Sequence, residues 1–285
     1  MYESLINRKH RGLFVIAIDC SASMQERITF NSLSLSKAEA VALVCNYTID
    51  ELIARATRQG IVRDYYDIAV IGYSGDSIQP LIGDGTQQRI AIDLLAKMAP
   101  EPCSYTFDQH PDDGTTVGAT FTLRPWITPR AAANTPMHKA MIEIERIVAE
   151  WCRMPENRDS FPPVVINISD GECSDGTATD LIAIAERIKS HATHDGNTLL
   201  LNIHLTTNDE AESVAFPANG LFDDICPFRR MLFAMSSILP ETMEPLIEEL
   251  INPGSYGPYR CVAFNASINE LIMILAIGSE SLKNM

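Results

Sequence analysis

The chain has 285 residues, 46% of them hydrophobic, and a formal net charge of −15. This length and apolar content are enough for a large core, while an acidic surface without a Lys/Arg stripe argues against nucleic-acid binding. The polar start does not resemble a signal peptide, no apolar run is long enough to span a bilayer, and seven scattered cysteines fit a reducing compartment better than a disulfide framework. We therefore expect a cytoplasmic protein.

The hydrophobic pattern predicts strands that alternate with helices along the chain. The expected strands cover residues 13–18, 68–73, 164–169, 199–205 and 260–264, and the expected helices cover residues 36–59, 87–98, 135–153, 177–193 and 266–277. Ser36 and Glu39 have the spacing of a capping box at the start of the first helix, and Gly60 follows its end. This order is typical of a doubly wound α/β fold with a mostly parallel central sheet.

Two stretches fall outside this alternation and are expected to be insertions in a single domain covering residues 1–285. The first, residues 99–133, is rich in Pro, Thr and Asp, and residues 115–123 partly alternate like one arm of a hairpin. The second, residues 206–259, contains an apolar run at 231–239 and a helical pattern at 241–250. Long loops at the carboxyl edge of a sheet often carry recognition, so the first insertion is the favoured site of partner contacts.

A carboxylate and two hydroxyls follow the first expected strand, in the order Asp19, Ser21, Ser23. Ligands of open α/β sheets bind beyond the carboxyl ends of the strands, and hard oxygen donors suit Mg²⁺ or Mn²⁺. Taken alone, the D-x-S-x-S pattern is weak, because Asp and Ser are ordinary loop and capping residues.

Two further segments strengthen the hypothesis of a metal site. Asp170, with Gly171 after it, ends the apolar strand that begins at Val164, so in a parallel sheet it emerges at the same edge as Asp19. Thr135 and Pro136 open an amphipathic helix, which makes Thr135 both a candidate N-cap and a candidate metal ligand. The rival pair Thr115 and Thr116 is not followed by such a helix.

These segments resemble the metal-ion-dependent adhesion site of von Willebrand factor type A domains. The resemblance spans about residues 13–277, and it assigns the metal ligands to Asp19, Ser21, Ser23, Thr135 and Asp170. Ala133 and Asn134 stand where many relatives have glycines. The resemblance also implies a Rossmann-like sheet with one short antiparallel edge strand. It further implies a bound Mg²⁺, or Mn²⁺ or Ca²⁺, and a protein partner whose Asp or Glu completes the coordination.

The charges of this set favour binding over catalysis. Two carboxylates neutralise one divalent cation, and the hydroxyls leave a coordination place for an anionic oxygen. The tail resembles bacterial stand-alone members of the tellurium-resistance kind, for which a kinase and a phosphatase encoded nearby are partners by analogy alone.

Two other functions stay open. A Mg²⁺-dependent phosphotransferase or hydrolase of the dehalogenase type needs a second Asp two residues after the first, and this chain has Ser21 there. A scaffold that binds through its acidic loops without metal is the other alternative. His191 and His194 have a spacing that can ligate a metal, but no third soft ligand is near them in sequence.

Overall fold

The computed structural model describes residues 1–30, 33–109, 117–206, 213–218, 226–250 and 256–266. Its main sheet has the order β15-β16-β14-β11-β1-β6-β7, and β8 also pairs with β6. The parallel strands are β1 (Gly12–Asp19), β6 (Tyr66–Ser74), β11 (Val164–Ser169), β14 (Leu199–His204) and β16 (Val262–Phe264). The antiparallel strands are β7 (Ser77–Pro80), β8 (Ile90–Ala91) and β15 (Val214–Ala215). The expected mostly parallel sheet is confirmed, with antiparallel strands at both ends rather than one.

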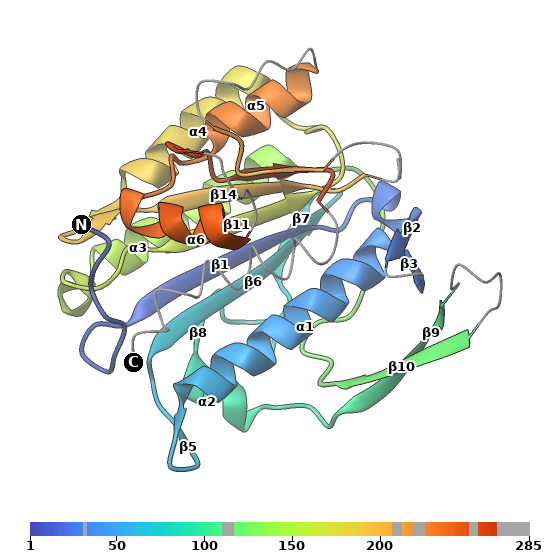
Figure 1. Ribbon diagram of the computed structural model, residues 1–285, viewed down its shortest axis with the longest axis horizontal. Coiled ribbons are helices and arrows are strands. Elements are labelled where there is room, and N and C mark those ends of the chain that lie inside the picture. Colours follow the sequence, from blue (N-terminus) through green and yellow to red (C-terminus); the bar gives the residue numbers. More distant parts are fainter. Residues whose placement is uncertain (31–32, 110–116, 207–212, 219–225, 251–255, 267–285) are drawn as a thin grey trace.

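Helices cover both faces of this sheet, as a doubly wound fold requires (Figure 1). One face packs against α1 (Lys37–Ala56), α2 (Ile92–Lys97) and α6 (Glu244–Leu250), the last preceded by a 3₁₀ turn at Glu241–Met243. The other face packs against α3 (Met137–Cys152), α4 (Ala178–Ser190) and α5 (Pro227–Met235). Side chains of β1 alternate between the two cores, with Phe14 in the first and Val15 in the second. No described helix has the length and apolar content needed to cross a membrane.

Pairing of short strands explains why two helices are shorter than the sequence predicts. The helix expected at 87–98 is only Ile92–Lys97, because Ile90 and Ala91 pair with β6 instead. Helix α4 stops at Ser190, since β12 (Ala192–Thr193) and β13 (Gly196–Asn197) form a hairpin after it. Of the helix expected at 266–277, all but Ala266 lies outside the described residues.

The capping box predicted for the first helix is present. The Ser36 hydroxyl accepts from the Glu39 amide at 3.1 Å, and the Glu39 carboxylate accepts from the Ser36 amide at 2.7 Å. After α1 the chain turns between β4 (Thr57–Arg58) and β5 (Ile61–Val62), where Gly60 has a φ of +74°. This is the left-handed region that glycine adopts without a steric cost.

A second sheet, with the order β10-β9-β3-β2, lies beside the main one. Strands β2 (Arg27–Phe30) and β3 (Leu33–Ser36) form a hairpin directly before α1, and β9 (Cys103–Gln109) and β10 (Val117–Leu123) come from the first predicted insertion. Pairing of Leu33 with Gln109 joins the two hairpins. The hairpin arm predicted at 115–123 is therefore confirmed over residues 117–123.

A chain of buried polar groups crosses the core on the side of α3 and α5. The Tyr73 hydroxyl donates to Asn167 Oδ1 at 2.9 Å, and Asn167 Nδ2 donates to Asn202 Oδ1 at 3.0 Å. Asn202 Nδ2 then donates to Ser236 Oγ at 2.9 Å. All four side chains are fully buried, and the hydrogen bonds offset the cost of removing them from water.

Candidate metal centre

The two carboxylates predicted as ligands emerge at the same edge of the main sheet. Asp19 is the last residue of β1, and Asp170 follows β11 directly. Because β1 and β11 are parallel neighbours in which Ile18 pairs with Ile168, both strands end at the same level. The crevice beyond this edge is where doubly wound folds bind ligands.

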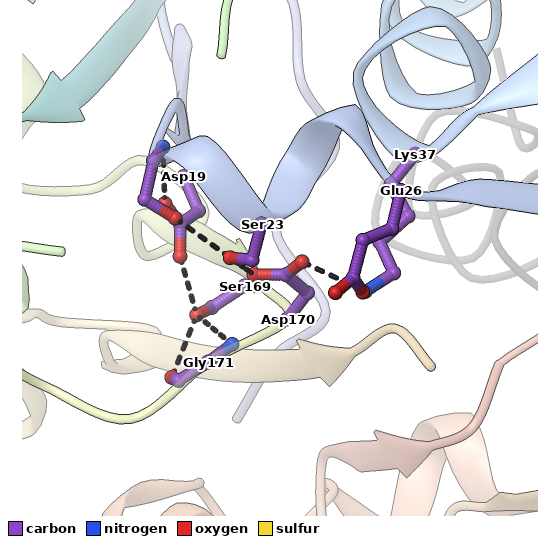
Figure 2. Close-up of polar contacts among 8 residues, drawn as sticks. Asp19, Ser23, Glu26, Lys37, Ser169, Asp170 and Gly171 are labelled. Atoms are coloured by element: carbon purple, nitrogen blue, oxygen red, sulfur yellow. Dashed lines mark hydrogen bonds and ion pairs between the residues drawn. The ribbon is translucent and has the colours of Figure 1, made fainter. Parts of the chain in front are cut away.

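Short contacts bring the serines of the D-x-S-x-S segment against these carboxylates (Figure 2). Ser23 lies in a 3₁₀ turn, Ala22–Gln25, and its hydroxyl donates to Asp170 Oδ1 at 2.7 Å. Ser21 Oγ lies 3.1 Å from Ser23 Oγ, and the Ser21 amide donates to Asp19 Oδ1 at 2.8 Å. Four of the five predicted residues are thus joined in one set of contacts.

The fifth, Thr135, lies near Gly171, the residue that follows Asp170. A Cβ on Gly171 would lie 3.8 Å from both Ser23 Oγ and Thr135 Oγ1. Glycine therefore leaves open a small space that these two hydroxyls face, and a larger residue would fill it. Thr135 is buried, as are Asp19 and Ser21.

Backbone hydrogen bonds hold the loop that contains Thr135 against the loop after β1 and the loop after β11. The Ala22 amide donates to Ala133 O at 2.9 Å, and the Ser174 amide donates to Thr135 O at 2.9 Å. Ala133 has a φ of +61°, in the left-handed region that favours glycine.

The prediction that Thr135 caps α3 is wrong. The N-cap position is Pro136, which makes no side-chain capping bond. Asp175, from the loop after β11, takes over this role: its carboxylate accepts from the amides of His138 at 2.9 Å and Lys139 at 3.0 Å. The Thr135 hydroxyl is therefore not the N-cap group of α3.

Ser169 is part of the centre and was not predicted from the sequence. Its hydroxyl donates to Asp19 Oδ2 at 2.8 Å and accepts from the Gly171 amide at 3.3 Å. Burial raises the pKa of Asp19 above its ordinary value, and hydrogen bonds from Ser21 and Ser169 partly oppose this. The signal in the sequence was the hydroxyl residue directly before Asp170.

Lys37 and Glu26 also adjoin the centre and were not predicted. Lys37 Nζ lies 2.8 Å from Asp170 Oδ2 and 2.8 Å from Glu26 Oε2 (Figure 2). The Lys37 side chain is 3% exposed and that of Asp170 is 0% exposed, whereas Glu26 is 55% exposed. A lysine at the first position of a helix opposes the helix dipole, and this was the available signal.

Other candidates from the sequence do not join this set. His191 Nε2 lies 2.7 Å from Glu145 Oε1, and His194 Nδ1 lies 2.8 Å from Asp159 Oδ1. The rival residues 115–116 lie outside the described residues. Within the part of the chain that the structure describes, no group of three or more His, Cys, Asp and Glu side chains is placed to hold a metal. A metal held at the sheet edge would therefore depend on hydroxyl oxygens as well as carboxylates.

The donor chemistry and the charge of the centre fit one divalent cation. Hydroxyl and carboxylate oxygens are hard ligands, and the position of a Cβ on Gly171 is 3.8 Å from each of the Ser23 and Thr135 hydroxyls. The carboxylates of Asp19, Asp170 and Glu26 and the ammonium of Lys37 together carry a formal charge of −2, which one divalent cation neutralises.

The fold and the centre define the molecule as a doubly wound α/β protein with clustered carboxylate and hydroxyl groups at the carboxyl edge of its main sheet. No family model and no curated protein matches the chain. Among solved structures, a von Willebrand factor type A protein from Catenulispora acidiphila is similar, with 13% identity, a TM-score of 0.46, and coverage of 96% of this chain and 43% of that one. The chain thus spans less than half of that protein's length. An uncharacterized membrane-spanning protein from Vibrio fischeri has 12% identity and a TM-score of 0.27 over 68% of this chain and 71% of its own. At these scores neither likeness carries an argument about function.

Proposed function

We propose that the chain is a von Willebrand factor type A domain that binds a protein partner through a divalent cation. The observation that carries the proposal is the set of contacts that joins Asp19, Ser21, Ser23 and Asp170 at one sheet edge, with Thr135 Oγ1 close to the neighbouring Gly171. The cation is Mg²⁺, with Mn²⁺ or Ca²⁺ as substitutes, and it would be held by Asp19, Ser21, Ser23, Thr135 and Asp170. Bound there, it supplies a Lewis-acidic centre for one more oxygen ligand.

An anionic oxygen is the natural further ligand, since a neutral loaded centre does not repel it. An Asp or Glu side chain on the partner would supply this oxygen. The sheet formed by β2, β3, β9 and β10 extends from the loops of the centre, and we propose it as the neighbouring contact surface for the same partner (Figure 1). A kinase and a phosphatase encoded nearby are candidate partners by analogy only.

Hydrolase or phosphotransferase chemistry has less support. The position two residues after Asp19 holds Ser21, whose hydroxyl contacts Ser23 Oγ. An unperturbed hydroxyl is a poor general acid at neutral pH, so the proton-transfer role of the dehalogenase type has no candidate there. This alternative would be favoured if the wild-type chain released phosphate from a phosphate ester in the presence of Mg²⁺ and if substitution of Asp19 by Asn abolished that activity.

The test is titration of Mn²⁺ into the wild-type chain and into Asp19→Asn. The asparagine fits the site, because its amide can donate to Ser169 Oγ while that hydroxyl donates to Gly171 O, 3.1 Å away. We expect Mn²⁺ affinity to fall more than about 100-fold while the fold is kept, since loss of a ligand costs more than loss of its supporting contacts.

Asp76→Asn is the matched control, because it removes the same charge from a residue that is 97% exposed and pairs with Lys139. Its Mn²⁺ affinity should stay close to wild type. Equal Mn²⁺ affinity in wild type and Asp19→Asn would contradict the proposal. Partner capture from the native cell that survives both a chelator and Asp19→Asn would favour the metal-independent scaffold.

We also propose a cytoplasmic location. Cys45 and Cys261 form no disulfide and are buried as small apolar packing residues. Fractionation of the native cell tests this, and recovery outside the cytoplasm would contradict it.

A further inference from the structure

Lys37 is an unusual residue for its place. Buried lysines are rare unless their ammonium is paired, and a cation at a helix N-terminus is disfavoured by the helix dipole. Lys37 is nevertheless 3% exposed at the first position of α1. Its ammonium binds Asp170 Oδ2, while the other oxygen of that carboxylate receives the Ser23 hydroxyl. The lysine thus places a positive charge directly behind a proposed metal ligand.

Glu26 balances that charge from the other side. It lies 2.8 Å from Lys37 Nζ, and the Lys37 amide also donates to Glu26 O at 3.0 Å. These contacts close the base of the β2–β3 hairpin, which begins at Arg27 and ends at Ser36. The pair has two possible roles, to hold the hairpin base and to set the charge of the centre. The first role predicts that either substitution weakens metal binding. The second predicts that removal of Lys37 strengthens it and removal of Glu26 weakens it.

We propose that Lys37 is a specificity-determining residue that weakens metal binding and strengthens anion binding at the loaded centre; this rests on the proposed function. Without Lys37, the three carboxylates would bind a divalent cation more tightly, and the loaded centre would keep a charge of −1 that repels a carboxylate. With Lys37, the loaded centre is neutral. Without Glu26 the loaded centre would instead be +1, which weakens metal binding and favours the anion.

The experiment compares Lys37→Met and Glu26→Gln, which break the same ion pair but change the charge in opposite directions. Mn²⁺ is titrated into each, with electron paramagnetic resonance of free Mn²⁺ as the readout. We expect Lys37→Met to bind Mn²⁺ about tenfold more tightly or better, because a unit charge within a few ångströms shifts an ionic equilibrium by about one to three powers of ten. Glu26→Gln should bind it more weakly, by a smaller factor because Glu26 is half exposed. The double variant should lie between the two.

Acetate then serves as the carboxylate probe on the Mn²⁺-loaded proteins. Displacement of metal-bound water by acetate lowers the water-proton relaxation rate. Lys37→Met should require several-fold more acetate than wild type for the same decrease, and Glu26→Gln should require less. Equal acetate dependence in all three proteins would overturn the anion half of the inference.

Lys97→Met is the control for loss of one lysine charge, because Lys97 is 69% exposed and pairs with Asp93 on α2. Its Mn²⁺ affinity should match wild type. If both Lys37→Met and Glu26→Gln bind Mn²⁺ more weakly, the pair acts only by holding the hairpin base, and the inference is overturned. Circular dichroism checks each fold. If Lys37→Met fails to fold, the acetate titration of Glu26→Gln still decides, because only the charge role predicts that this variant requires less acetate than wild type.

The outcomes also separate this inference from the proposed function. Mn²⁺ binding by wild type that Asp19→Asn does not weaken would overturn the proposed function, whatever Lys37→Met does. Binding that depends on Asp19 but is not tightened by Lys37→Met would overturn only the inference. If wild type and both variants bind no Mn²⁺, both proposals fall.

Discussion

At the scale of single residues, a substitution at Thr135 should change metal binding without changing the stability of α3. Its hydroxyl faces the space at Gly171, while Asp175 caps α3. We therefore expect Thr135→Val, which keeps the side-chain volume, to weaken Mn²⁺ binding about tenfold or more while the free energy of unfolding stays within about 1 kcal/mol of wild type. Mn²⁺ titration and urea unfolding of the metal-free protein measure the two effects.

Thr135→Ser is the matched control, since it restores the hydroxyl without the methyl group. It should recover most of the Mn²⁺ affinity. Unchanged Mn²⁺ affinity in Thr135→Val would exclude Thr135 as a ligand and leave Thr115 or Thr116 as the candidate.

The sequence located the proposed ligands but not their supporting residues. Asp19 and Asp170 could be found because each directly follows an apolar strand, and parallel strands end at a common edge. Lys37 could not be placed beside Asp170, because the two residues are 133 positions apart and no local pattern joins them. Ser169 is adjacent in sequence to Asp170, yet its bond to Asp19 depends on the pairing of two distant strands.

At the scale of elements, the buried polar chain ties β6, β11, β14 and the C-terminal end of α5 together. Asn167 is its central member and bonds both Tyr73 and Asn202. Asn167→Ala leaves Asn202 Oδ1 without its donor and leaves the Tyr73 hydroxyl only its longer bond to Ile168 O at 3.4 Å, so we expect a loss of about 2–4 kcal/mol in the free energy of unfolding. Urea denaturation followed by far-UV circular dichroism measures this loss.

Tyr73→Phe tests the same chain more gently. It removes only the hydroxyl, and the expected loss is about 1–2 kcal/mol. Wild-type stability in Asn167→Ala would mean that these buried polar groups do not depend on one another.

The sequence pattern predicted helices and strands well where their bounds are set by nearby residues, and poorly where they are set by pairing with distant strands. The capping box at Ser36 fixed the start of α1, and the apolar run before Asp19 fixed β1. No strands were predicted at Arg27–Phe30 or Leu33–Ser36, because that hairpin is part of a sheet whose other strands are about 70 residues away in sequence. Helix α2 was overestimated for a similar reason, since pairing with β6 overrides the helical pattern at residues 90–91.

At the scale of the whole molecule, His204 gives stability a dependence on pH. Burial, together with a smaller effect of the nearby Arg229 guanidinium, lowers the pKa of His204 from 6.5 to about 4. Above pH 6.5 neither folded nor unfolded chain protonates this residue. As pH falls below that value, only the unfolded chain gains the proton, so this contribution to stability is lost toward pH 4. The expected loss is about 2 kcal/mol between pH 7 and pH 5.

Urea unfolding of wild type and His204→Gln at pH 7 and pH 5 isolates this effect, because other titrating groups act equally in both proteins. The variant should lose about 2 kcal/mol less than wild type over this interval. His194→Gln, at a residue that is 56% exposed, provides the surface control. The same pH dependence in wild type and His204→Gln would exclude His204 as its source.

The central claim is that Asp19, Ser21, Ser23, Thr135 and Asp170 hold one divalent cation together. Anomalous scattering from a crystal of the wild-type chain grown with Mn²⁺ tests it directly. We expect one strong peak beyond the ends of β1 and β11, with hydroxyl oxygens at about 2.0–2.3 Å and the carboxylates bound directly or through water. A Mn²⁺ peak elsewhere, or none at this edge in crystals that contain Mn²⁺, would contradict the account.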